Sequence, residues 1–189
     1  SRLADIYVND AYGTTHREHA STATMAKFFE YKCPGILLEN EIKSLQKLMN
    51  NPERPVTSII GGAKVSSKIS VIANMLDVVD NLIIGGGMAY TFIKNNGGSI
   101  GDSIFESDRL EDCSKIISLA KEKNVNIFLP DDVVASNEFS NSSLKKTLKI
   151  NEIPDGWQGL DIGPSSEIKF DKIIKQSKTV LWNGPMGVF

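Results

Sequence analysis

Short apolar runs alternate with amphipathic segments along most of the chain. Beyond Pro55, unbroken apolar runs predict strands at residues 56–60, 82–84, 125–129 and 179–182. Apolar side chains at steps of three and four predict helices at residues 65–79, 88–94, 110–123 and 166–177. Strands without polar alternation are typical of sheets buried on both faces, so we expect an α/β fold with a parallel sheet flanked by helices. The stretch 133–150 is less regular and predicts no defined element.

The first fifty residues show a different pattern. Ile6-Tyr7-Val8 predicts the end of a buried strand, and a helix is expected from Thr14 or Thr15 to Phe29. Cys33-Pro34-Gly35 ends that helix and is the best candidate for a domain boundary. An amphipathic helix follows at residues 36–49, either as a connection between domains or as an ordinary outer helix. The predicted parts are the end of a second α/β domain at 1–33, a linker helix at 34–50 and an incomplete main domain at 51–189.

Composition narrows the possible partners. The formal net charge is -2 and no basic cluster is present, which disfavours nucleic acid. The apolar runs are far shorter than the ~20 residues of a membrane span. Cys33 and Cys113 lack the spacing of a metal or redox motif, so we expect two reduced thiols and a cytoplasmic protein. The chain opens at Ser1 and stops at Phe189 directly after a glycine-rich turn, so both ends are expected to be cuts.

Glycines gather where the predicted strands end. Gly61-Gly62 follows the first strand of the main domain, Gly85 to Gly87 the second, and Gly184 and Gly187 the last. Ligands of parallel sheets bind outside the carboxyl ends of the strands, where glycine lets the backbone approach closely. These turns therefore favour a ligand site over simple tight turns. The same reasoning places Gly159 with them at one rim of the sheet.

A pair of lysines stands beside the first glycine turn. Lys64 and Lys68 are expected on one face of the first helical turns, where two like charges favour an anion between them over a merely solvated face. The dinucleotide pattern GxGxxG fails because Tyr90 takes its last position, and the GxxxxGK[ST] loop is absent. A different phosphate-binding arrangement is therefore expected.

Three other groups are weaker candidates. His16 and His19 share a spacing that suits a metal, but no third ligand is visible, so no metal site is predicted. Arg17 is better interpreted as an anion-binding fork at the start of a helix. Asp131-Asp132 could bind a cation, although a turn or a helix cap is the commoner role of such a pair.

Five segments together resemble phosphoglycerate kinase, in that family's order and at roughly its spacing. They are Tyr7–Gly13 running into His16-Arg17, Gly61–Ser66 running into Lys68, Leu82–Ala89, Gly156–Pro164 and Trp182–Phe189. The resemblance covers the whole chain, which is about half as long as a full member of the family. Tyr12, Ser67 and Asp131 depart from the usual residues, but none of the three is given a chemical role.

The resemblance implies a Rossmann-like fold and specific site residues. Arg17 would hold the phosphate of 3-phosphoglycerate in the second domain, Lys64 would follow the migrating phosphoryl group as the catalytic residue, and Lys68 would grip the nucleotide phosphates. The main domain would bind the nucleotide, and the positions that match the family's nucleotide site are Gly62, Ala63, Lys64, Lys68, Gly86, Gly87, Gly159, Leu160, Asn183, Pro185, Gly187 and Val188.

The implied reaction is glycolytic. It transfers a phosphoryl group reversibly from 1,3-bisphosphoglycerate to ADP, giving 3-phosphoglycerate and ATP, with Mg²⁺ held by a segment that this chain lacks. A monomer is expected. Because most of the acceptor site is also missing, the chain itself is expected to be inactive, and a nucleotide-binding module without turnover is the alternative. A nicotinamide-dependent oxidoreductase is disfavoured by the failed GxGxxG pattern.

Overall fold

A computed structural model describes residues 4–188 of the chain. The chain divides into two compact units, Ser1–Pro52 and Glu53–Phe189, and each is described by itself. The division falls after the predicted linker helix, which therefore belongs to the first unit. The assignment of residues 1–33 and 34–50 to a second domain and a linker remains a prediction.

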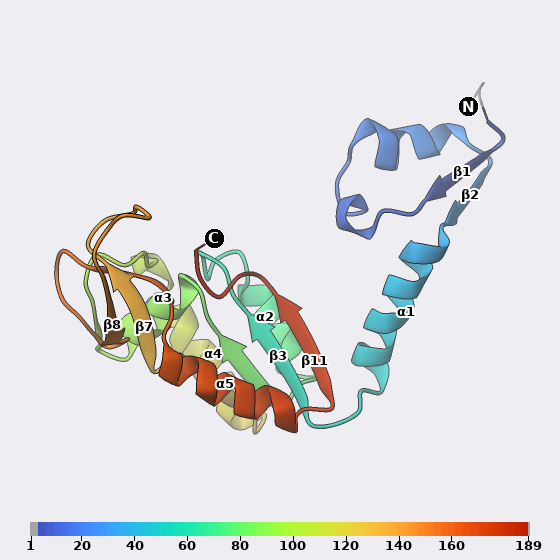
Figure 1. Cartoon of the computed structure of the whole chain (residues 1–189). Helices are drawn as coiled ribbons and strands as arrows, with labels where there is room; N and C mark the ends of the chain where they lie inside the picture. The colour runs from blue at the N-terminus through green and yellow to red at the C-terminus, as the bar shows by residue number, and fades with distance from the viewer. Residues whose placement is uncertain (1–3, 189) are drawn as a thin grey trace. The chain divides into compact units, whose positions relative to one another are not determined.

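The first unit is built on two short parallel strands. Strand β1 (Ile6–Asn9) pairs with β2 (Tyr31–Pro34), and the two appear beside each other in Figure 1. The prediction of a buried strand was wrong for this chain, because Ile6 and Val8 are more than half exposed. Two strands and the turns between them provide too little structure to cover both faces.

The segment between β1 and β2 is not the predicted α-helix. It contains a 3-10 turn (Tyr12–Thr14), one π turn (Ala20–Thr24) and a second 3-10 turn (Met25–Phe28). Side-chain hydroxyls compete for the backbone here: Thr15 Oγ1 donates to Ala11 O at 2.8 Å, and Thr22 Oγ1 to Arg17 O at 2.8 Å. Such local bonds offer the backbone an alternative to a regular helix.

Helix α1 (Ile36–Asn50) follows β2 and confirms the predicted amphipathic helix. Its amino-terminal turn is fixed by Asp10, whose Oδ1 accepts a hydrogen bond from Leu38 N at 2.8 Å. Gly35 leaves room for this carboxylate, since a Cβ on Gly35 would lie 2.2 Å from Asp10 Cγ. The start of the helix is thus tied to the end of β1.

A four-stranded parallel sheet forms the centre of the second unit and confirms the predicted fold class. Its order is β11 (Thr179–Asn183), β3 (Val56–Ile60), β4 (Asn81–Ile84) and β6 (Asn126–Phe128). Strand β11, red in Figure 1, lies against β3 although more than a hundred residues separate them in sequence. All three pairings are parallel, so the four strands end at the same rim.

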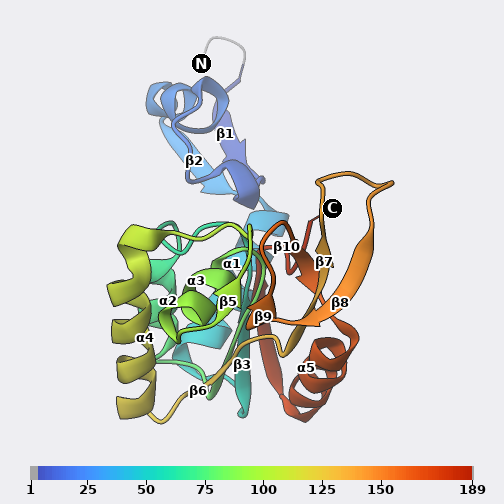
Figure 2. The ribbon, with the colours of Figure 1, turned by 90° about the vertical axis from the view of Figure 1, so that its left-hand side faces the viewer.

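Helices cover both faces of this sheet. Helices α2 (Ile69–Met75), α3 (Met88–Asn95) and α4 (Leu110–Glu122, preceded by a 3-10 turn at Ser107–Arg109) lie on one side, and α5 (Pro164–Gln176) lies on the other (Figure 2). Successive side chains along a strand point to opposite faces of the sheet. Ile59 and Ile83 pack with Phe170 under α5. Helices α3, α4 and α5 match the prediction to within two residues at each end.

Helix α2 differs from the prediction, because it begins at Ile69 instead of residue 65. The preceding loop is held by hydrogen bonds from two serines. Ser67 Oγ donates to Lys64 O at 2.9 Å, and the hydroxyl and N–H of Ser66 both bind Glu106. The helix thus begins about one turn later than predicted.

The less regular stretch 133–150 contains two strands that the sequence did not reveal. Strand β7 (Asp132–Ser136) pairs antiparallel with β8 (Lys145–Lys149) and with β10 (Gln158–Ile162), and a short parallel pair joins β5 (Ser99–Ile100) to β9 (Glu152–Ile153). A separate apolar cluster binds this sheet to α3 through Tyr90, Ile93, Val133 and Ala135. Strand β8 was missed because four of its five residues are exposed, which leaves no apolar alternation.

Candidate functional site

Three turns meet at the rim where the parallel strands end. Gly61 N donates to Asn183 O at 2.9 Å, Gly86 N to Met186 O at 3.0 Å, and Met88 N to Gly62 O at 2.9 Å. Backbone bonds therefore join the turns that follow β3, β4 and β11. The predicted meeting of these glycine turns at one rim is confirmed.

Glycine is required in these turns by close backbone approach. A Cβ on Gly61 would lie 2.0 Å from Pro185 O, and Gly86 adopts a φ of 65° with its Cβ position 2.6 Å from Gly62 N. No side chain fits at either position without moving main-chain atoms of the neighbouring turn. The absence of these side chains keeps the rim open.

The rim encloses a cavity of about 290 Å³, which we call the glycine cavity. Most of the predicted nucleotide-binding residues line it: Gly62, Ala63, Gly86, Gly87, Gly159, Leu160, Pro185, Gly187 and Val188. Five further lining residues were not predicted from the sequence, namely Tyr90, Ile104, Phe139, Gln158 and Met186. The position of Tyr90 in the first turn of the helix after Gly85–Gly87 was the available signal. Phe139 belongs to the missed hairpin and gave none.

Gly159 and Leu160 reach the cavity from β10, not from the end of a parallel strand. This corrects the expectation that Gly159 lies at a turn of the parallel sheet. The strand is held in place by Gly159 N, which donates to Ser103 Oγ at 2.9 Å, and by Val188 N, which donates to Leu160 O at 2.9 Å. A second sheet therefore supplies one wall of the cavity.

Tyr90 contributes a buried side chain with a polar group to these walls. Tyr90 is 4% exposed and its ring packs against Gly159, where a Cβ would lie 2.1 Å from the hydroxyl. Burial, and then the negative charge of Asp161, raise the pKa of this phenol well above its ordinary value. The group therefore stays a neutral phenol at physiological pH.

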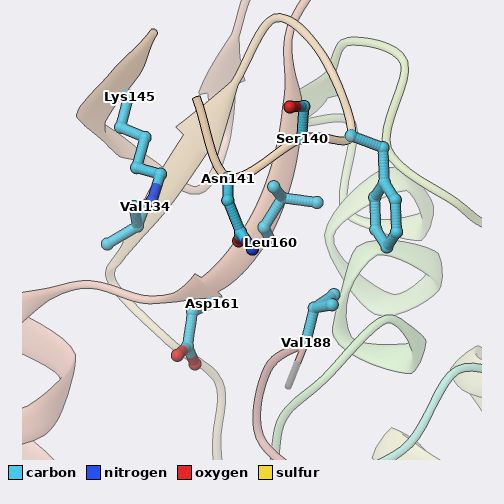
Figure 3. A pocket seen from close by; sticks show the side chains of 8 residues that line it. Val134, Ser140, Asn141, Lys145, Leu160, Asp161 and Val188 are labelled. Carbon is cyan, nitrogen blue, oxygen red and sulfur yellow. The ribbon is translucent and has the colours of Figure 1, made fainter. Parts of the chain in front are cut away.

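A second cavity of about 640 Å³, here the hairpin cavity, adjoins the first. The two share three lining residues, Phe139, Leu160 and Val188. Figure 3 shows Leu160 on β10 and Val188 on the carboxyl-terminal segment at its wall, with Asn141 and Lys145 of the β7–β8 hairpin around the same space. The glycine cavity thus opens into a wider and more polar space.

The two predicted anion-binding lysines lie at the same rim but not on one helix face. Lys64 is exposed in the loop before α2, and Lys68 is the residue directly before the helix. The Nζ of Lys68 donates to Oδ1 of Asn183, a predicted site residue in the turn after β11. Lys68 and Asn183 are thus brought together, while the expected helical pair with Lys64 was wrong. Lys64, Lys68 and Asn183 are not among the residues that line the glycine cavity.

Asp132 caps a helix. This was one of the roles predicted for the Asp131-Asp132 pair. Its carboxylate accepts from Ser165 N at 3.0 Å and from Ser166 N at 2.8 Å, at the start of α5. Burial by itself would raise the pKa of Asp132, but the hydrogen bonds from Ser166 and Ser165 lower it below its ordinary value. Asp131 instead pairs with Lys169 at 2.6 Å.

Arg17 belongs to the first unit, so its position relative to the cavity is not described. It lies exposed in a bend after the first 3-10 turn, where its Nε donates to His16 Nε2 at 3.4 Å, and not at the start of a helix as predicted. Across residues 4–188, His, Cys, Asp and Glu side chains form no group of three or more that could hold a metal ion. Within the same range, no helix has both the length and the apolar character needed to cross a bilayer.

Fold and site together define an α/β protein with a ligand-sized cavity at the carboxyl ends of parallel strands. A family model described as phosphoglycerate kinase matches residues 1–189. The chain belongs to the phosphoglycerate kinase family.

Two solved structures are similar to the chain over its whole length. The phosphoglycerate kinase from Coxiella burnetii is 40% identical, with a TM-score of 0.86, and the one from Pyrococcus horikoshii OT3 is 24% identical, with a TM-score of 0.82. The second likeness concerns the fold alone. The chain covers 48% of each of these proteins and so spans about half their length.

Proposed function

We propose that the chain supplies the nucleotide site of a glycolytic kinase that transfers a phosphoryl group from 1,3-bisphosphoglycerate to ADP. The observation that carries the proposal is the glycine cavity, because segments from 62 to 188 converge there on one ligand-sized space. Nine of its lining residues match the family's nucleotide site. A cavity of this kind, mostly apolar with few polar groups, suits a flat base and its ribose.

The phosphates would extend from the cavity toward Lys68 and Asn183. These side chains already contact each other at the rim, so the cationic group is held beside the turn after β11. An ammonium group and free backbone N–H groups favour phosphate oxygens. Lys64, exposed in the loop before α2, would meet the phosphoryl group as its charge moves. Arg17 would bind the phosphate of the acceptor.

Phosphoryl transfer needs positioning and charge neutralisation more than covalent chemistry. The proposed site is consistent with this, since its roles fall to lysines and glycine turns. Mg²⁺ would arrive with the nucleotide and neutralise phosphate charge. The described residues offer the ion no group of three or more His, Cys, Asp or Glu side chains.

Isothermal titration of the chain with ADP tests the proposal. We expect weak binding that Leu160→Ala reduces, because Leu160 lines both cavities. Ile168→Ala is the matched control, since Ile168 is 61% exposed on α5 and lines neither cavity. Absence of ADP binding by the folded chain, or equal binding by both variants, would contradict the proposed site.

The alternative is a nucleotide-binding module without turnover, which the 48% coverage of the solved relatives favours for the chain taken alone. A coupled assay of ATP formation from 1,3-bisphosphoglycerate separates the two. We expect activity from the full-length protein that carries this sequence and none from the chain by itself. ATP formation by the isolated chain would show that the missing half is not required.

A further inference from the structure

Glu106 makes an unusual contact with the loop that carries Lys64. Its Oε2 accepts from Ser66 N at 2.9 Å and its Oε1 accepts from Ser66 Oγ at 2.6 Å. The two residues lie 40 positions apart in the sequence. Because both carboxylate oxygens bind one residue, the contact fixes the orientation of that residue as well as its distance.

Glu106 itself is anchored to the helices of the second unit. Glu106 is the residue before the 3-10 turn at Ser107–Arg109 that leads into α4, and among the described residues its side chain makes no hydrogen bond that caps this turn. Its main-chain N–H donates to Thr91 Oγ1 on α3 at 3.2 Å, and Thr91 is buried. Glu106 therefore ties the loop before α2 to the rigid part of the unit.

The charge of Glu106 suits this role. Burial alone would raise its pKa, but hydrogen bonds from Ser66 and Val65, together with the charge of Lys64, lower the pKa below its ordinary value. Glu106 is therefore ionised at neutral pH. A charged acceptor gives stronger hydrogen bonds than a neutral one.

We propose that Glu106 is a positioning residue that acts through Ser66 to hold the loop at 61–68, and with it Lys64, in the geometry that phosphoryl transfer requires. The proposal rests on the proposed function. Lys64 stands two residues before Ser66, so a shift of Ser66 moves the backbone from which Lys64 extends. Glu106 itself is not a lining residue of either cavity, so its effect on the nucleotide is indirect.

The test combines kinetics with an exchange measurement on the ligand-free protein. Glu106→Gln keeps the shape of the side chain but loses its charge and one acceptor oxygen. In the full-length protein that carries this sequence, we expect kcat to fall about ten- to a hundred-fold while KM for ADP changes by less than about threefold. The Ser66 amide should exchange faster with solvent. Glu111→Gln is the control, since Glu111 is an exposed acid on α4 whose carboxylate pairs with Lys115 at 2.8 Å.

A double-mutant cycle with Ser66→Ala shows whether the effect passes through Ser66. We expect Glu106→Gln and Ser66→Ala together to lower kcat no more than the stronger of the two alone. Unchanged kcat in a folded Glu106→Gln enzyme, unchanged exchange at Ser66, or additive losses would overturn the proposal. A wild-type enzyme without kinase activity would overturn the proposed function, and with it this inference, whereas the other outcomes leave the proposed function intact.

Discussion

Gly86→Ala tests whether the glycine cavity depends on backbone packing between its turns. The new Cβ would lie 2.6 Å from Gly62 N, 2.8 Å from Gly62 O and 2.8 Å from Pro185 O, all of them main-chain atoms. Gly86 also has a φ of 65°. The substitution therefore carries two costs, one for the left-handed backbone and one for moving the neighbouring turns.

Gly97→Ala separates these costs because it carries only the first. Gly97 follows α3 with a φ of 83°, and within the described chain no atom lies closer than 4 Å to its Cβ position. Its N–H donates to Lys94 O at 3.0 Å, as is common where a helix ends. The two variants thus share a backbone conformation and differ in the space around it.

The expected magnitudes follow from the two terms. A left-handed alanine costs about 1–2 kcal/mol, partly offset by the loss of unfolded-state entropy, so Gly97→Ala should lower the free energy of unfolding by about 1 kcal/mol. Overpacking adds about 1–3 kcal/mol, so Gly86→Ala should lower it by about 3 kcal/mol. The difference of about 2 kcal/mol measures the close approach of the turns.

Urea unfolding, followed by the fluorescence of Trp157 and Trp182, gives both values. Titration with ADP then gives the functional consequence, and we expect binding to be lost in Gly86→Ala and kept in Gly97→Ala. Equal losses of stability in the two variants would refute the argument from close approach. Wild-type ADP affinity in a folded Gly86→Ala chain would refute the placement of the nucleotide.

Three further predictions concern α5, Lys64 and local stability. Asp132→Ala should cost about 2–3 kcal/mol in urea unfolding, because three donors at the start of α5 lose their acceptor. Since the folded pKa of Asp132 is lowered, its contribution is present at neutral pH and should fade as the pH drops through that folded pKa; a cost that is equal at acid pH would contradict this. Lys64→Ala in the full-length protein should lower kcat far more than it raises KM for ADP, and the reverse would make Lys64 a uniform binding residue. Amide exchange should be fast in residues 4–33 and slow in β3, β4 and β11, whereas uniform protection would contradict the division of the chain.

Much of the second unit could be predicted because its elements are specified locally. The apolar runs that became the central strands β3 and β4 are buried on both faces, which leaves a continuous signal in the sequence. The edge strands β6 and β11 are partly exposed, but their short apolar runs still predicted strands. Helices α3, α4 and α5 show the spacing of one buried face. In parallel strands of this kind, the turns after each carboxyl end share one rim, so the meeting of Gly61, Gly86 and Pro185 followed from the order of elements alone.

The features that were missed depend on pairing partners and contacts that the local pattern does not show. Strand β8 is mostly exposed and is a strand because β7 pairs with it, which no local pattern announces. The loop before α2 is held by Glu106, 40 residues beyond Ser66. A contact over this distance leaves no signal in the local sequence pattern.

The sequence by itself determined the α/β class, the glycine turns and the residue types offered to a phosphate. Only the tertiary structure decided how they combine. Lys64 lies in the loop before α2 and does not share a helix face with Lys68, whose side chain contacts Asn183 instead. Gly159 and Leu160 come from an antiparallel strand and complete the wall of the cavity. The physical reason is that backbone conformation and apolar spacing are local properties of a chain, whereas a cavity consists of contacts between segments far apart in the sequence, and tertiary packing decides which of these form.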